Sequence, residues 1–191
     1  MEKMQKEMNR RMNKLLQLVF ILIAFASPES SASSSSFSSR KLLADEAPPL
    51  KLITGDQQVT VDNGLFSATF SVPEGMINEI RYNGISNLLS ENEDLNSRMY
   101  FDAVSGKPPA FRIDATKYNV TVQTDEQVEL SFTYTWDAKN SSVFPVNVEK
   151  RYVVLRGFSG IYIYGIYERL KGWPDMDFVQ TRIVFKPNGD K

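Results

Sequence analysis

The feature that most constrains the fold is a run of three closely spaced predicted strands near the C-terminal end of the chain. Residues 149–156 and 161–169 are rich in β-branched and aromatic side chains, and Gly and Pro at the two breaks suit tight turns. These two strands carry large apolar groups on both faces, so we expect a sheet that is covered on both sides. The third strand, residues 178–186, alternates in polarity and places Arg182 and Lys186 on one face.

Shorter predicted strands precede this run. Residues 58–62 and 65–72 flank Asn63-Gly64, the strongest short-range signal for a β-hairpin. Residues 76–82 and 98–104 have strand composition as well. The clearest stripe of period 2 consists of Val128, Leu130, Phe132, Tyr134 and Trp136. Many strands at short spacing, with no amphipathic helix after residue 50, predict an all-β fold, an antiparallel β-sandwich of two sheets. Because the last strand has the pattern of an interior strand, we expect the sandwich to be incomplete at the C-terminus.

Two absent residue types limit the chemistry of this chain. It contains no Cys, which excludes disulfides, thiolate metal sites and a Cys nucleophile, and no His, which excludes Ser-His-Asp schemes and the commonest general base. We therefore expect no metal and no cofactor. The net charge is −1, and residues 1–26 hold five Lys or Arg against two Glu. A chain that lost these residues would be more acidic, so no nucleic-acid partner is expected.

The N-terminus has the pattern of a secretory signal peptide, residues 1–26. A positively charged segment precedes an apolar run, residues 15–26, which is shorter than the ~20 residues that a membrane span requires. Cleavage is expected after Ala26 or Ala32, and the alternative is an uncleaved anchor. Residues 27–49 form a Ser- and Pro-rich linker that we expect to be disordered, and residues 50–191 form the folded domain.

Two glycosylation sequons agree with secretion. They begin at Asn119 and Asn140. Together with the leader they predict a secreted, extracellular or cell-wall protein, with no membrane contact after the leader is removed.

Arg182 and Lys186 are the candidate binding residues. They are four residues apart on one strand face, or about 13 Å. Two cations at such a spacing suit carboxylates along an acidic polysaccharide, and the planar fork of Arg matches a carboxylate in bidentate fashion. The alternative is a solvated strand face with ordinary charges.

Two further groups of residues have competing interpretations. Four aromatic residues form either a sugar-stacking platform or core packing, and Trp173, in a Gly-Trp-Pro turn, is the one most expected to be exposed; they are Tyr162, Tyr164, Tyr167 and Trp173. Asp175 and Asp177 form either a carboxylate pair for glycoside hydrolysis or ordinary loop acids.

Five blocks of sequence, in order, resemble the N-terminal region of plant rhamnogalacturonate lyases (polysaccharide lyase family 4). They are residues 59–65 (VTVDNGL), 80–85 (IRYNGI), 150–157 (KRYVVLRG), 166–168 (IYE) and 172–175 (GWPD). The resemblance covers about residues 57–187. It implies a secreted enzyme that cleaves rhamnogalacturonan I, the pectin backbone of alternating rhamnose and galacturonate, by β-elimination. It also implies a galactose-mutarotase-like super-sandwich as the N-terminal domain.

The resemblance also assigns roles to individual positions. Arg182 matches a family arginine that contacts the substrate, and Lys186 stands where fungal members carry a second arginine. The catalytic lysine and histidine of the family lie beyond Lys191, so no catalytic residue is expected in this chain, and Lys150 belongs to a strand block instead. We therefore expect the N-terminal part of a rhamnogalacturonan endolyase that contributes substrate binding. The alternative is a non-catalytic secreted carbohydrate-binding β-sandwich. The oligomeric state is open.

Overall fold

The fold is an all-β sandwich in the part of the chain that the computed structural model describes. The structure describes residues 17–24, 47–91, 98–104, 110–139 and 144–189, and for residues 17–24 the backbone alone. No helix occurs among these residues. None of them therefore forms a helix long and apolar enough to cross a membrane.

The strands form three sheets, and every pairing within them is antiparallel. The five-stranded sheet has the order β1-β11-β10-β9-β8, the four-stranded sheet β2-β3-β4-β5, and the three-stranded sheet β12-β6-β7. The strands are β1 (Gln17–Ala24), β2 (Lys51–Thr54), β3 (Gln58–Asp62), β4 (Phe66–Ser71), β5 (Ile77–Tyr82), β6 (Tyr100–Val104), β7 (Phe111–Arg112), β8 (Lys117–Gln123), β9 (Gln127–Tyr134), β10 (Asn147–Leu155), β11 (Gly160–Glu168) and β12 (Gln180–Val184).

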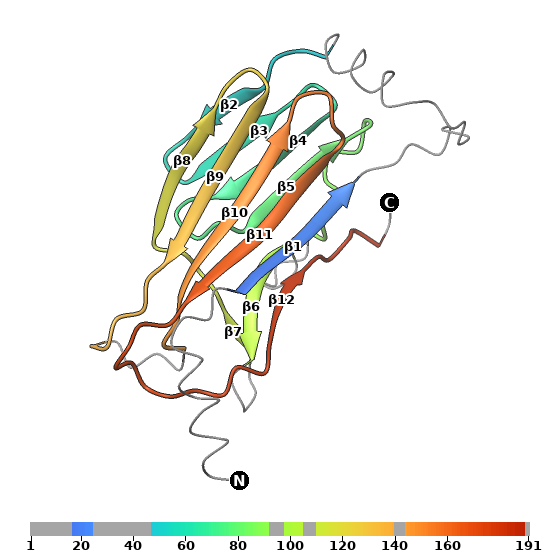
Figure 1. The fold of residues 1–191 in the computed structure, drawn as a ribbon. Helices are drawn as coiled ribbons and strands as arrows, with labels where there is room; N and C mark the ends of the chain where they lie inside the picture. Colours follow the sequence, from blue (N-terminus) through green and yellow to red (C-terminus); the bar gives the residue numbers. More distant parts are fainter. Residues whose placement is uncertain (1–16, 25–46, 92–97, 105–109, 140–143, 190–191) are drawn as a thin grey trace, which may run out of the picture.

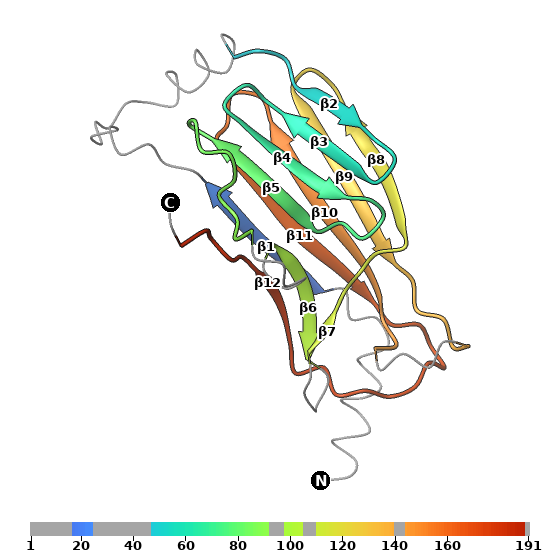
Figure 2. The same cartoon turned by 180° about the vertical axis from the view of Figure 1, so that it is seen from behind.

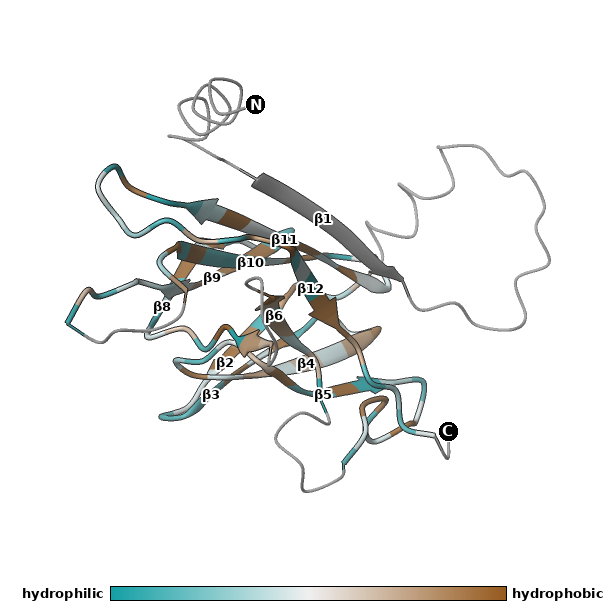
Figure 3. Ribbon diagram, turned by 90° about the horizontal axis from the view of Figure 1, so that it is seen from below, coloured by the Kyte–Doolittle hydropathy of each residue, from teal (hydrophilic) through white to brown (hydrophobic). Residues whose placement is uncertain are grey.

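The five-stranded sheet forms one layer of the sandwich, and the other two sheets lie against its inner face (Figures 1 and 2). Seen from below, β8 to β11 lie above β2 to β5 (Figure 3). An isolated bridge between Ile77 and Met99 joins the four-stranded sheet to the beginning of β6. The predicted antiparallel sandwich is thus confirmed, and its second layer consists of two sheets instead of one.

Aromatic rings fill the space between the layers. Phe70 of β4 stacks on Phe132 of β9 at 5.9 Å between ring centroids. Tyr152 of β10 meets Phe70 and Phe101 edge to face, with centroids 4.9 and 6.1 Å apart. All four side chains are at most 1% exposed. Burying one such ring stabilises the fold by roughly 1.5–3 kcal/mol, so these contacts join β4, β6, β9 and β10 into one core.

The predicted hairpin is confirmed, and the predicted stripe is confirmed from Val128 to Tyr134, whereas Trp136 lies beyond β9 and is half-buried. Residues 58–62 and 66–71 pair across Asn63-Gly64, with Val61 opposite Ala68. In the stripe, Val128, Leu130 and Phe132 are at most 1% exposed, and Tyr134 is buried too.

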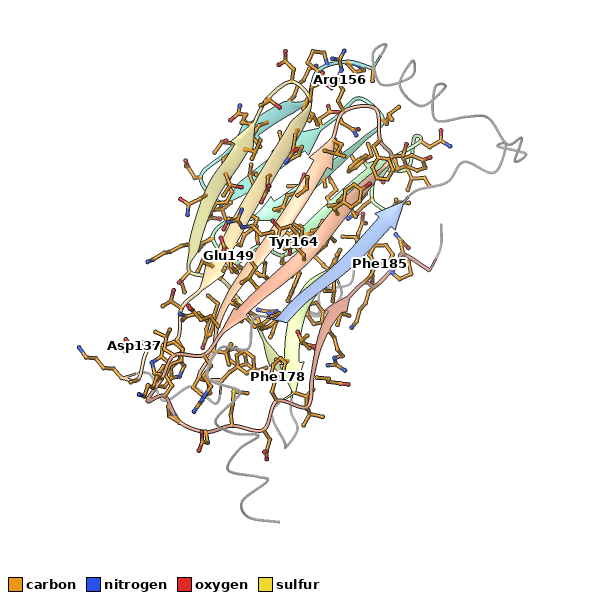
Figure 4. All side chains as sticks on the ribbon, viewed as in Figure 1. Asp137, Glu149, Arg156, Tyr164, Phe178 and Phe185 are labelled. Carbon is orange, nitrogen blue, oxygen red and sulfur yellow. The ribbon has the colours of Figure 1, made fainter. Side chains whose placement is uncertain are left out.

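The prediction that the two strands 149–156 and 161–169 are covered on both sides is wrong. In β10 and β11 buried and half-buried residues alternate, so only one face of each strand is fully buried. The outward face is half-buried because it carries an ionic network, in which Arg151 contacts Glu129 and Glu149 and the Tyr164 hydroxyl donates to Glu129. Figure 4 shows Glu149 and Tyr164 over this sheet.

The two ends of the described fold meet the sheets at their edges. β12 is shorter than the predicted strand, and among the described residues it pairs only with β6. In the described residues β12 is therefore an edge strand. In the five-stranded sheet, β1 is an edge strand and pairs with β11 from Gln17, opposite Tyr167, to Ala24, opposite Gly160. These residues belong to the predicted leader.

Lys150 is a fully buried cation-bearing side chain inside the sandwich. It is 1% exposed, and its Nζ donates to the carbonyls of Glu74, Gly75 at 3.3 Å and Ile113 at 2.9 Å. Burial lowers the pKa of its ammonium from 10.5 to about 7. The contacts join β10 to the turn after β4 and to the segment after β7, which is a structural role and agrees with the prediction that Lys150 belongs to a strand block.

Candidate functional site

Arg182 lies on β12 and is held in place by one buried carboxylate. It stands directly opposite Asp102 of β6. Its Nε donates to Asp102 Oδ1 at 2.7 Å, and its Nη2 donates to Oδ2, so the pair is bidentate. The Asp102 side chain is 4% exposed and that of Arg182 is 46% exposed. The hydrogen bonds to Asp102 raise the pKa of the guanidinium, which therefore stays charged.

The same face of the three-stranded sheet carries a second arginine and an aromatic ring. Asp102 is opposite Arg182 on one side and Arg112 of β7 on the other. Arg112 binds Asp114 through Nε at 2.9 Å and Nη2 at 2.8 Å, and its pKa is raised by that hydrogen bonding. Since side chains alternate along a strand, Tyr100 of β6 projects on the same side as Asp102. We call the surface made by Tyr100, Asp102, Arg112 and Arg182 the arginine face.

The opposite side of β12 anchors the strand to the core. The Tyr167 hydroxyl and Thr181 Oγ1 are 2.5 Å apart, and Thr181 Oγ1 donates to the Asp102 carbonyl at 3.2 Å. Tyr167 is 3% exposed, and burial raises the pKa of its phenol. A neutral, buried tyrosine thus fixes the backbone of β12 at the residue before Arg182.

Lys186 lies just beyond β12, on the segment that leaves the sheet. Its backbone carbonyl accepts a hydrogen bond from Ser90 N–H at 3.0 Å, and Pro187 forms a bridge with Leu89. Phe185, the residue between β12 and Lys186, is 38% exposed, and Figure 4 shows it beside β12. Lys186 therefore follows the arginine face along the chain, although it is not part of the paired strand.

The four aromatic residues, for which a sugar-stacking platform and core packing were the two interpretations, do not all share one face of the fold. Tyr167 is a core residue, and Tyr162 stacks on Phe158 at 5.3 Å on the outward side of β11. Trp173 is half-buried, because it packs on Trp136 with centroids 4.7 Å apart. Tyr164 lies on the same outward face of β11 as Tyr162, and its hydroxyl donates to Glu129. In the described structure the four rings therefore form no single platform.

Asp175 of the Gly-Trp-Pro-Asp turn is bound to an arginine, and Asp177 lies two residues beyond that turn. Asp175 Oδ1 accepts a hydrogen bond from Arg169 Nη2 at 2.7 Å, and the same arginine donates to the carbonyls of Trp173 and Pro174. Arg169 therefore closes this turn, and Asp175 acts as its counter-ion. Asp177 is exposed on the segment that leads to β12. Among the described residues no group of His, Cys, Asp and Glu is arranged to hold a metal ion.

Of the two predicted sequons, the one at Asn119 lies in the part of the chain that the structure describes. Asn119 is exposed in the middle of β8, opposite Ser131 of β9. Ser131 donates to Glu149 at 2.6 Å, on the outward side of the five-stranded sheet. A glycan at Asn119 would therefore extend over that outward face. Asn140 lies outside the described residues.

Sequence reasoning missed Asp102, Arg112 and Tyr100. One signal was present, because residues 100–104 read Tyr-Phe-Asp-Ala-Val and place an acid inside an otherwise apolar strand. A carboxylate in such a strand needs a cationic partner when it is buried. The identity of that partner was not accessible, because Arg182 is 80 residues away in sequence.

The arginine face joins guanidinium groups to an aromatic ring on the outside of a β-sandwich. Guanidinium forks bind carboxylates, and rings beside hydrogen-bond donors suit sugars, so this architecture fits a protein that binds an anionic, hydroxyl-rich chain. A family model described as the rhamnogalacturonate lyase family matches residues 36–191. The chain therefore belongs to the rhamnogalacturonate lyase family, a family of pectin-degrading lyases. No curated protein and no solved structure matches the chain.

Proposed function

We propose that this chain is the N-terminal portion of a secreted plant rhamnogalacturonan endolyase, and that it binds the acidic backbone of rhamnogalacturonan I. Family membership supports the substrate class, and the sequence blocks support the N-terminal placement. The leader and the exposed sequon at Asn119 support secretion to the cell wall. In the full-length enzyme the polysaccharide would be cleaved by β-elimination.

The observation that carries this proposal is the Arg182–Asp102 pair. A guanidinium has five N–H groups, and two of those of Arg182 donate to Asp102. No other described residue accepts a hydrogen bond from the remaining three, and the side chain is 46% exposed. The buried carboxylate of Asp102 thus fixes the plane of the Arg182 guanidinium. The outer N–H groups of that guanidinium are then available to a uronate carboxylate.

β-Elimination requires a base that removes the proton at C5 of the uronate, and cations near the carboxylate make that proton easier to remove. On this chain Arg182 and Lys186 would supply the cations near the uronate carboxylate. The chain has no His, and the ammonium of Lys150 is enclosed by backbone carbonyls. We therefore propose that the chain binds the polysaccharide without cleaving it, the base being supplied by another part of the full-length enzyme.

Two measurements on the 191-residue chain test this function. Incubation with rhamnogalacturonan I is expected to give no rise in the ultraviolet absorbance of unsaturated uronates. Calorimetry is expected to detect binding of the polysaccharide, weakened by Arg182→Ala. A clear rise in absorbance would contradict the assignment of the base to another segment. Binding without any cleavage by the full-length protein would favour a carbohydrate-binding protein over an enzyme.

A further inference from the structure

A pocket opens between the two Asn-Gly turns of the four-stranded sheet. Its volume is about 360 Å³, and its lining includes Asp62, Ser67 and Arg81 together with Gly64 and Gly84. Two of the sequence blocks described above, residues 59–65 and 80–85, supply these turns. Neither block contributes a residue to the arginine face. Binding of uronates at that face therefore gives the pocket no role.

The polar groups of the pocket form one row across three strands. Asp62 of β3 stands opposite Ser67 of β4, and Ser67 stands opposite Arg81 of β5. Neighbouring strands are about 4.8 Å apart, so a carboxylate and a guanidinium flank a hydroxyl over about 10 Å. Three such groups in a row offer acceptors and donors to adjacent hydroxyl groups of one pyranose ring.

The charges of the pocket favour a neutral ligand. Arg81 Nε lies 2.8 Å from Glu79 Oε1, and Asp62 lines the same pocket, so two acids accompany one arginine here. Asp62 Oδ1 accepts a hydrogen bond from the Gly64 N–H at 2.8 Å, which holds the carboxylate at the edge of the pocket. A uronate would meet this carboxylate and the paired arginine, whereas a neutral sugar would meet one acceptor and one donor. The apolar side of the pocket is Leu65, which is 42% exposed and suits the C–H face of a sugar ring.

The pocket continues toward the segment that carries Lys186. Ser86 lines the pocket, and four residues later Ser90 N–H donates to the Lys186 carbonyl. Four extended residues span at most about 14 Å, the length of two or three sugar units. Asn188 N–H also donates to the Leu88 carbonyl, so the two segments run side by side. Figure 3 shows the end of β5 and the chain after β12 on the same side of the molecule.

From this continuity we infer that the pocket binds a neutral pyranose unit of the same polysaccharide whose uronates contact Arg182 and Lys186. The inference rests on the proposed function for the identity of the chain, but not for the existence of the sugar site. The arginine face would bind the carboxylates of the polysaccharide, and the pocket would bind the hydroxyl groups and one apolar ring face of a neutral sugar. Together they would distinguish a backbone of mixed neutral and acidic sugars from a purely acidic one.

The test uses separate ligands for the two sites. The ¹⁵N-labelled chain is titrated with methyl rhamnoside or methyl galactoside, and shifts are expected for the Gly64 and Gly84 amides. Ser67→Trp, which fills the pocket, and Arg81→Ala, which removes the donor, should each weaken this binding about tenfold or more. Thr133→Trp, on the outward face of the other sheet, is the matched control and should leave the titration unchanged.

The outcomes separate the two claims. Absence of shifts at Gly64 and Gly84 with both neutral glycosides overturns the sugar site, whatever the arginine face does. Shifts that persist unchanged in Ser67→Trp and Arg81→Ala overturn it as well. Oligogalacturonate, which contains no neutral sugar, reports on the arginine face alone. If it fails to bind while the glycosides bind in the pocket, the proposed function fails and the sugar site stands.

Discussion

Replacing Lys150 by methionine is expected to remove most of the pH dependence of folding stability between about pH 6 and pH 9. Lys150 is fully buried, and its ammonium is surrounded by three backbone carbonyls over the ring of Phe101. The chain contains no His and no Cys, so few other side chains titrate in this range. Methionine keeps the length and the apolar stem of the side chain and cannot be protonated.

The magnitude follows from the change in the pKa. Burial lowers the pKa of Lys150 from 10.5 to about 7, so between these values the unfolded chain binds more protons than the folded chain. The free energy of unfolding therefore rises with pH between these two values. Below about pH 7 the folded protein holds a buried, charged ammonium, and above about pH 7 it holds a neutral amine, whose burial costs less. Linkage gives an increase in the free energy of unfolding of roughly 2–3 kcal/mol from about pH 6 to about pH 9.

Urea denaturation at a series of pH values measures this increase directly. The wild-type chain should show the rise, Lys150→Met should show a nearly flat profile, and Lys117→Met, at an exposed position of β8, should follow the wild type. Lys150→Met is expected to be less stable overall, since it leaves carbonyls without donors, but the slope is the readout. A wild-type stability that is flat or falls as the pH rises would refute the reasoning, as would an unchanged slope in Lys150→Met.

Further predictions concern the turn after β4, the glycan and the strength of the ionic contacts. Gly75→Ala should destabilise the fold by about 2 kcal/mol or more in urea denaturation, because Gly75 has φ +68° and an added Cβ would lie 2.4 Å from Phe132. Gly84→Ala, with φ +80° and nothing within 4 Å, should cost only about 1 kcal/mol, and equal losses would contradict the packing argument. Asn119→Gln should lower the mass of the protein from a secretory host by one glycan, and an unchanged mass would exclude glycosylation at Asn119. Binding of oligogalacturonate should weaken several-fold as salt rises, and a salt-independent affinity would contradict a contact made by charges.

The sequence predicts the class of fold well because period-2 patterns and turn residues act locally. Asn63-Gly64 specifies a hairpin within a few residues, and the alternation from Val128 onward assigns one face of β9 to the core. The coverage of β10 and β11 could not be read in the same way. The outward residues of β11 include Tyr162, Tyr164 and Ile166, which look apolar, whereas β10 already carries the charged Glu149 and Arg151 on its outward face. Glu129, a residue of β9, joins Arg151 and Tyr164 in an ionic network that only the strand order reveals.

The candidate site is predictable in part for the same reason. Alternation identifies the face on which Arg182 lies, and the resemblance gives it a role. The groups that orient Arg182 come from β6, which is distant in sequence, so Asp102 emerges only when β12 pairs with β6. The pocket between the two Asn-Gly turns depends on the register of β3, β4 and β5, which places Ser67 between Asp62 and Arg81.

The most direct measurement is calorimetry at low salt, which compares the affinities of the wild-type chain and of Arg182→Ala for oligogalacturonate. We expect that Arg182→Ala weakens binding about tenfold or more, that Arg182→Lys recovers part of the loss, and that Lys117→Ala has no effect. A near-ultraviolet circular dichroism spectrum identical to that of the wild type establishes that the variant is folded. Equal affinities of the wild type and Arg182→Ala would contradict the account.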